Sequence, residues 1–434
     1  MIAILLSQAA FAGATVGSYG RVQASADARG GEAQPVNVVS YGTRLEKASY
    51  LELDLMLDEG IEAGPQFKVV VTPALQGNLF HYEGEWDASL ALRNLYVEAN
   101  EWSNLPLSAW AGSRMYRGED VHLLDFWPLD SLNTLGAGLR ADPTGWTVAV
   151  HGGTSRVAAD AWQVQYDAVP VAGGVGTEAI EILDRQRMVG SIKGGRLTDT
   201  YKVLLYSELH GLPEGTRVND QRIQQDLPAD RGSVVGLQAS AYGWANDSFV
   251  HLWLKRATGL AAYGDLSVPG GLATDYTVKS AREHLVATAA NHEAGPAAVQ
   301  VGAYLRRFED ADGNQLDVDD RWEANVHVRP AYSPTENVTL AVEAGQQWLR
   351  PDGLNPRTET HDLPKVTKLA VLPSIQPERG SFSRPQLRLQ YIYSFLNNDA
   401  RAWYDFADPR HASNHQHFVG VGAEWWLNSA GYQR

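Results

Sequence analysis

The sequence predicts an all-β fold, a transmembrane antiparallel β-barrel of about 18 strands, formed by a single domain over residues 13–434. Three observations support this prediction. Apolar and polar residues alternate with a period of two from one end of the chain to the other. No run of about 18 uninterrupted apolar residues occurs, so no membrane-spanning helix is expected. Short and long connections take turns between the candidate strands, as periplasmic turns and extracellular loops do in such barrels.

The alternation is clearest in residues 50–57, 249–256, 321–330 and 384–393. In the first of these, one face consists of leucines and the other is mostly polar: Leu51, Leu53, Leu55 and Leu57 lie opposite Tyr50, Glu52, Asp54 and Met56. Such a strand has one face suited to lipid and one suited to water. Roughly 16–18 segments of about ten residues follow this pattern, which is the length that a tilted spanning strand needs.

The connections fall into two classes. The short ones are residues 142–145, 243–248, 291–296 and 333–337, and the long ones include 29–40, 154–175, 258–276, 350–366 and 397–415. No compositional break marks a domain boundary, and no repeat of fixed period occurs.

A large soluble β-sandwich, solenoid or propeller is the alternative fold, because its strands also alternate. Two features favour the membrane barrel. The polar faces contain full charges, such as Arg384 with Arg388, and Arg321 with Glu323. The apolar faces end in aromatic residues such as Trp322 and Tyr391. A water-filled lumen tolerates the charges, and a bilayer interface favours the aromatic rings.

The composition excludes several classes of protein. The 434-residue chain has no cysteine, so it has neither disulfides nor thiolate metal sites. Its net charge of −15 argues against nucleic acid as a partner. The glycine pairs lack the Lys-Ser/Thr and the helix of a phosphate-binding loop, and no G-x-S-x-G elbow occurs. We therefore expect no cofactor and no enzymatic activity.

Residues 1–12 resemble the remnant of a secretory signal peptide. A short apolar run precedes the cleavage-like sequence Ala10-Phe11-Ala12, although a basic n-region is missing. A buried N-terminal strand is the alternative.

Asp120, His122 and Asp125 form a polar cluster in one connection. Carboxylates and a histidine at this spacing occur in metal sites and in hydrolases. A loop of mixed polar residues explains them better, so no metal site is predicted.

Four segments show a family resemblance. Residues 16–23 read VGSYGRVQ, 109–127 read AWAGSRMYRGEDVHLLDFW, 382–390 read FSRPQLRLQ, and 417–426 read HFVGVGAEWW. These resemble the maltoporins, sugar-specific porins of the Gram-negative outer membrane. The resemblance extends over residues 16–145 and 381–427. It implies an eighteen-stranded barrel, usually trimeric, with a loop folded inward to narrow the pore. Oligosaccharides would diffuse passively along a file of aromatic residues with charged groups beside it.

The resemblance also assigns residues. The file of aromatic side chains falls on Tyr19, Tyr50, Trp86, Phe249, Phe382 and Trp426, of which Trp86 would reach into a neighbouring subunit's pore. The constriction and the polar track fall on Arg21, Arg44, Glu52, Arg93, Arg117, Asp120, His122, Asp125, Trp127, Arg384 and Arg388.

The sequence departs from the family pattern at three places. Gly118 stands where an arginine is usual, Trp127 replaces the constricting tyrosine, and the paired cysteines of the first loop are absent. These departures concern the choice of sugar more than the pore itself.

Other functions remain open at this point. A secreted β-rich glycoside hydrolase or a lectin fits the acidic surface and the 13 tryptophans. A general or anion-selective porin fits the lumen arginines, although Glu52, Asp120, Asp125 and Glu424 oppose anion selectivity.

Overall fold

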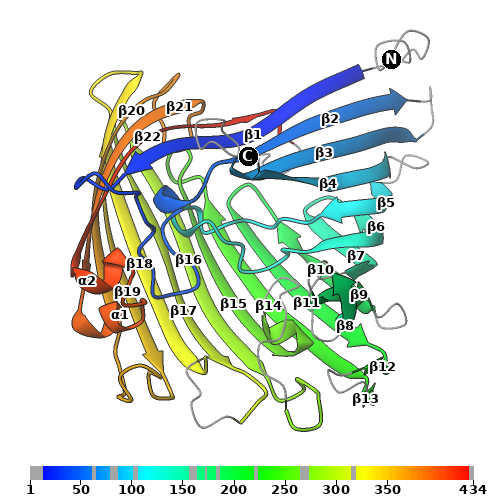
Figure 1. The fold of residues 1–434 in the computed structure, drawn as a ribbon. Helices are drawn as coiled ribbons and strands as arrows, with labels where there is room; N and C mark the ends of the chain where they lie inside the picture. The colour runs from blue at the N-terminus through cyan, green and yellow to red at the C-terminus, as the bar shows by residue number, and fades with distance from the viewer. Residues whose placement is uncertain are drawn as a thin grey trace.

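A computed structural model shows one closed antiparallel sheet of 18 strands (Figure 1). Consecutive barrel strands pair with each other, and β1 pairs with both β2 and β22, which closes the cylinder. The structure describes residues 13–60, 65–78, 87–100, 106–155, 164–171, 174–181, 186–218, 223–263, 273–313 and 319–429. The predicted barrel is confirmed. Residues 1–12 lie outside the described residues, so the signal peptide stays a prediction, as does the single domain over 13–434. Trp86 also lies outside the described residues, so its role stays a prediction too.

The barrel strands are β1 (Gly13–Ala26), β2 (Tyr50–Gly60), β3 (Gln66–Asn78), β4 (Asp87–Asn100), β5 (Leu107–Met115), β6 (Asn133–Ala141), β7 (Trp146–Ser155), β10 (Arg187–Leu197), β11 (Tyr201–Leu212), β14 (Asp230–Tyr242), β15 (Phe249–Gly259), β16 (Arg282–Ala294), β17 (Ala297–Glu309), β18 (Arg321–Tyr332), β19 (Val338–Pro351), β20 (Lys365–Ile375), β21 (Gln386–Leu396) and β22 (His415–Leu427). Two hairpins stand outside the barrel sheet, formed by β8 (Val164–Val171) with β9 (Gly174–Glu181) and by β12 (Gly215–Val218) with β13 (Gln224–Leu227). The helical elements are η2 (Arg44–Glu46), η5 (His122–Leu124), η6 (Leu260–Tyr263), α1 (Asn398–Ala402) and α2 (Pro409–Ala412).

The two faces of each strand differ as the alternation predicts. On β2, Leu53 and Leu55 are 40% and 41% exposed, whereas Glu52 and Asp54 are 1% and 0% exposed. Exposed leucines and valines recur on the outer face of most barrel strands, where lipid would cover them. None of the described helices is long and apolar enough to cross a membrane.

The two ends of the barrel differ in their connections. At one end the strands are joined by short turns such as residues 142–145, 243–248 and 295–296. The opposite end has the long connections, with α1, α2 and both extra hairpins (Figure 1). Part of the long connection predicted over 154–175 is strand, because β8 begins at Val164. By the rule for bacterial barrels, the long-loop end is extracellular and the short-turn end is periplasmic.

Candidate functional site

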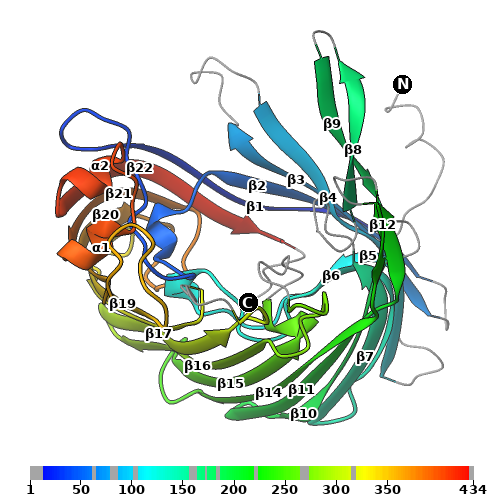
Figure 2. The same ribbon diagram turned by 60° about the horizontal axis from the view of Figure 1, so that its bottom comes forward.

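The loop between β5 and β6, residues 116–132, folds into the barrel (Figure 2). Hydrogen bonds from Tyr116 N to Leu132 O and from Gly118 N to Asp130 O extend the hairpin inward. Beyond them, η5 is followed by its C-cap residue Asp125, whose φ of 53° lies in the left-handed region. Aspartate tolerates that region better than most residues, so the loop can turn sharply there.

Apolar packing holds loop 116–132 against the barrel wall. Its buried side chains Val121, Leu124, Phe126 and Leu129 form one cluster with wall residues of β11 and β14–β17, namely Tyr206, Val234, Trp253, Ala257, Leu285, Ala287, Ala289 and Tyr304. Two wall residues that face this loop, Gly236 and Gly302, are glycines. A Cβ atom at Gly236 would lie 2.3 Å from Leu129 Cδ2, and one at Gly302 would lie 3.1 Å from Leu123 Cβ. These glycines let the loop approach the sheet closely.

A second loop, residues 27–49 between β1 and β2, also folds inward, which the sequence analysis did not anticipate (Figure 2). Leu45 packs against Ala370, Leu372, Ile392 and Phe418 of the wall. The other anchors of this loop are hydrogen bonds and an ion pair with buried charged side chains of the wall, namely Glu323, Glu343 and Lys368. The lumen is therefore narrowed by two loops rather than one.

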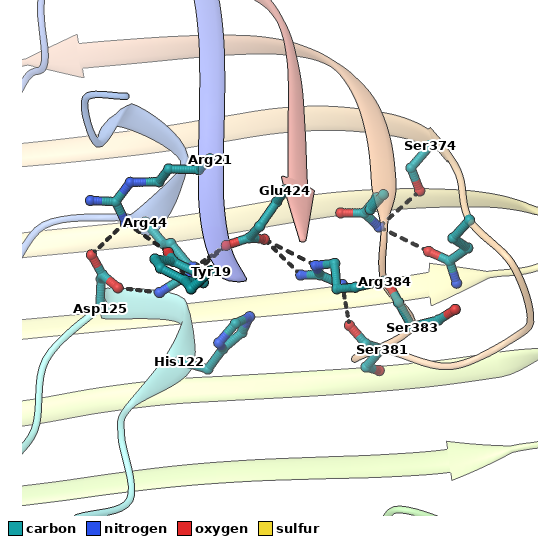
Figure 3. Close-up of polar contacts among 12 residues, drawn as sticks. Tyr19, Arg21, Arg44, His122, Asp125, Ser374, Ser381, Ser383, Arg384 and Glu424 are labelled. Atoms are coloured by element: carbon teal, nitrogen blue, oxygen red, sulfur yellow. Dashed lines mark hydrogen bonds and ion pairs between the residues drawn. The ribbon is translucent and has the colours of Figure 1, made fainter. Parts of the chain in front are cut away.

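An ion-pair network joins the two loops to each other and to the wall (Figure 3). Arg44 of loop 27–49 contacts Asp125 of loop 116–132 and lies 2.6 Å from Glu424 of β22. Arg21 of β1 lies 2.9 Å from the other carboxylate oxygen of Asp125, and Arg384 lies 2.8 Å from Glu424. Burial would raise the pKa of Asp125, but Arg44 and Arg21 outweigh it and hold that pKa below its usual value.

Tyr19, predicted as the first aromatic of the file, lies behind this network. It is 1% exposed, and its hydroxyl accepts a hydrogen bond of 2.7 Å from Arg44. Its ring lies 5.9 Å from that of Tyr50, which is partly exposed. Tyr19 therefore positions Arg44 and supports Tyr50 more than it presents a surface to solutes.

Tyr50, Glu52 and Arg93 form a second cluster on β2 and β4. Arg93 lies 2.8 Å from Glu52, and the Tyr50 hydroxyl contacts both side chains. Tyr50 was predicted for the aromatic file and Glu52 and Arg93 for the polar track, and the structure brings the three together on the inner wall.

The predicted aromatic residues Phe249, Phe382 and Trp426 line one cavity of about 610 Å³, together with Trp127 and Asp120. The Phe249 and Phe382 rings are stacked, with centroids 5.9 Å apart. This cavity opens between loop 116–132, the turn 243–248 and residues 378–383, at the short-turn end of the barrel.

Other polar-track residues support this cavity from behind or lie beside it. The Arg117 guanidinium lies 4.6 Å from the Trp127 ring centroid and donates to Ser131. The Arg384 guanidinium lies 4.3 Å from the Trp426 ring. The His122 ring meets Phe382 edge-on at 5.2 Å.

Arg388 lines a smaller adjacent cavity beside Arg329 and Arg384. Arg388 therefore lies outside the aromatic cavity, although the segment just before β21 lines both cavities.

The aromatic cavity also has lining residues that were not among the predicted site residues, including Glu119, Tyr242 and His251. Glu119 accepts hydrogen bonds from Lys202 and from the Tyr242 hydroxyl, at 2.5 and 3.1 Å. Burial would raise the pKa of Glu119, but His251 and Lys202 outweigh it and lower that pKa. The alternation in residues 249–256 already put His251 on the inner face, so the sequence contained a signal for this residue.

The geometry is that of a channel with a narrowed lumen, and comparison with known proteins agrees. The model of the LamB porin family matches residues 15–426. The chain belongs to the LamB porin family. As a LamB porin with a closed barrel, it resides in the outer membrane of a Gram-negative bacterium.

Two solved structures of outer-membrane proteins are similar to this chain at low sequence identity. Pseudomonas aeruginosa OprD has a TM-score of 0.48 at 11% identity, covering 96% of each chain. A BenF-like porin from Pseudomonas fluorescens Pf-5 has a TM-score of 0.48 at 12% identity, covering 95% of this chain and 98% of that one. No curated protein matches this LamB porin.

Proposed function

We propose that this LamB porin is a carbohydrate-selective channel, in which oligosaccharides of the maltodextrin type diffuse passively past aromatic rings flanked by charged groups. The observation that carries the proposal is the shared cavity of Trp127, Phe249, Phe382 and Trp426, with Asp120 in the same wall. Membership of the family supports a channel rather than an enzyme.

The chemistry of a sugar fits this cavity. Pyranose rings have C–H faces that pack on aromatic rings, whose faces are electron-rich. Their hydroxyl groups need hydrogen-bond partners once water is displaced, and charged partners are stronger than neutral ones. Glu119 and Asp120 supply acceptors beside the rings. Several shallow contacts in sequence favour passage, because one deep site would retain the solute.

The charge balance supports a neutral solute over an anion. Arg21, Arg44 and Arg384 each pair with Asp125 or Glu424, so two carboxylates offset most of the charge of three guanidinium groups in this part of the lumen. An anion-selective porin would need cationic groups with free charge along the pore. The reversal potential across a salt gradient tests this, and strong anion selectivity would favour that alternative.

The secreted hydrolase or lectin is the other alternative. It requires a surface suited to water, whereas the outer wall of this barrel exposes leucines and valines on most strands. Recovery of the folded protein without detergent, or release of reducing sugar by it, would support that alternative.

Planar-bilayer recording tests the proposed selectivity. Added maltodextrins should block the current in a concentration-dependent manner. Trp127→Ala should raise the single-channel conductance and weaken the block roughly 2- to 10-fold, the value of one lost aromatic contact. Trp322→Ala is the matched control, because Trp322 is exposed on the outer wall and should leave both quantities unchanged. Wild-type current that no sugar blocks would reduce the protein to a general porin.

We further propose that the protein forms a homotrimer, as the family resemblance implies, with Trp86 reaching a neighbouring pore. Sedimentation of the detergent-solubilised protein tests this assembly. A monomer would contradict both the homotrimer and the role of Trp86 in a neighbouring pore.

A further inference from the structure

Four basic residues and a tryptophan form a row across five neighbouring strands on the outer wall. Cross-strand pairing aligns Arg256 of β15, His284 of β16, Arg307 of β17, Trp322 of β18 and Arg350 of β19. All five occupy outward-facing positions, one to three residues from the long-loop end of their strands. We call these five residues the outer basic row.

An apolar row lies directly beneath it, two residues further into each strand. Its members are again aligned by cross-strand pairing: Leu254, Val286, Leu305, Ala324 and Trp348. Four of them are large hydrophobic side chains exposed on the outer surface. Two residues along a strand amount to about 7 Å, so the basic row lies at the boundary of the lipid-facing band that is nearer the long loops. Trp322 and Trp348 at this boundary fit the aromatic girdle of such barrels.

The charges of the row are only partly neutralised by the protein. Arg307 pairs with Glu309 and Asp352, and Arg282 on the adjoining row pairs with Glu309. Arg256 and Arg350 are exposed, and within the described part of the chain no ion pair involves them. Four arginines therefore face two carboxylates on this surface.

The basic surface is confined to one side of the barrel. On β1–β7, β10 and β11, the described outward positions in the half nearer the long loops include no lysine, arginine or histidine. The chain as a whole has a net charge of −15, so general basicity does not explain the row.

We propose that the outer basic row binds the phosphate groups of the outer-leaflet glycolipid, lipid A. The long-loop end places the row at the level of the outer-leaflet headgroups. Planar guanidinium groups match phosphate oxygens in pairs, and arginine tolerates the boundary of the bilayer far better than its centre. In the row, Arg256, Arg307 and Arg350 alternate with His284 and Trp322, so neighbouring arginines lie two strands, or about 10 Å, apart, and separate phosphates of one lipid can contact different arginines. The apolar row beneath then packs against the acyl chains of the same lipid.

Native mass spectrometry of the purified porin tests this proposal. The probes are lipid A with both phosphates and the same lipid after dephosphorylation. The wild-type protein should retain the phosphorylated lipid preferentially. Arg256→Gln with Arg350→Gln should weaken retention about 30-fold, because two arginines near the headgroups lose their charge. Asp352→Asn should strengthen it, because Arg307 loses a competing carboxylate.

The matched control is Arg196→Gln, which removes an exposed arginine near the short-turn end and should not alter retention. Heat-dependent mobility on gels verifies that each variant is folded. Equal retention of dephosphorylated lipid, or equal effects of Arg196→Gln and the double variant, would overturn the proposal. Displacement of the lipid by millimolar inorganic phosphate would overturn the assignment to a lipid and indicate a site for free phosphate. If the double variant fails to fold, the Asp352→Asn gain alone decides, and its absence counts against the proposal.

Discussion

The two inward loops narrow the same lumen but are held by different interactions. Loop 116–132 lies against β11 and β14–β17 through buried apolar side chains. Loop 27–49 is anchored largely by hydrogen bonds to buried charges: Ser40 bonds to Glu323, Thr43 bonds to Glu343, and Glu46 pairs with Lys368 at 2.6 Å. Apolar packing needs shape complementarity, whereas buried charges need every partner in place.

The loops contact each other, so neither is independent. Tyr41 stacks on Phe126 with ring centroids 4.2 Å apart, and Arg44 pairs with Asp125. Damage to either anchor should therefore alter the aperture, but the two anchors should respond differently to changes in side-chain volume, charge and pH.

The largest effect should come from placing a charge in the apolar anchor. Leu124→Asp buries an unpaired carboxylate in the cluster beneath loop 116–132 and should cost about 5 kcal/mol or more of docking energy. The loop should leave the wall, so conductance should rise and sugar block should disappear in bilayer recordings. Leu124→Met preserves the volume and should change conductance little. Normal conductance in Leu124→Asp would mean that this loop does not set the aperture.

A somewhat smaller loss is expected from the ionic anchor. Glu343→Ala leaves Arg329 and His327 without their carboxylate, at a cost of about 3–5 kcal/mol. The midpoint of urea unfolding in detergent measures it. Arg329→Met with Glu343→Met removes both charges and should recover much of the loss. If the double variant is no better than the single one, the carboxylate is not needed to neutralise Arg329.

The link between the loops should depend on pH only under acidic conditions. The pKa of Asp125 is lowered in the folded protein, so its ion pairs contribute fully above the ordinary aspartate value of about 3.9. That contribution is lost as the pH falls through the lowered pKa. Conductance and sugar block should therefore stay constant from pH 7 to pH 5 and change below about pH 4.

Asp125→Asn should reproduce the acidic state at pH 7, with a loss of about 1.5–3 kcal/mol from its bonds to Arg21 and Arg44. A wild-type transition between pH 5 and pH 7 would assign the pH dependence to another group.

The smallest effect should come from an exposed ion pair in the connection between β15 and β16, at the long-loop end of the barrel. Asp275 and Lys279 are both exposed to solvent, where water and salt screen their attraction. Asp275→Asn should leave the unfolding midpoint, the conductance and the sugar block unchanged. A clear loss would contradict the view that burial distinguishes the anchoring charges.

Local patterns in the sequence predicted the barrel and much of its inner wall. The two-residue period put Glu52, His251 and Glu323 on the inner face, where the structure has them. The motif around Asp120 and Trp127 predicted the inward loop, because the family resemblance covers that segment without a gap.

The second inward loop could not be predicted in this way. Its anchors Glu323, Glu343 and Lys368 lie about 300 residues away in the chain, and alternation does not state which strands face each other across a lumen. The burial of Tyr19 was missed for the same reason, because Arg44 covers it from a loop rather than from a strand.

The seam between β1 and β22 has a consequence for how the barrel is made. Its nine paired positions, from Ser18–Leu427 to Ala26–Val419, join segments about 400 residues apart in the chain. Until β22 docks, the growing sheet presents two unpaired edges that can capture other strands. Since contacts of such long range form slowly, docking of the last strand should limit the rate of assembly, and variants that weaken this seam should accumulate as open, protease-sensitive sheets.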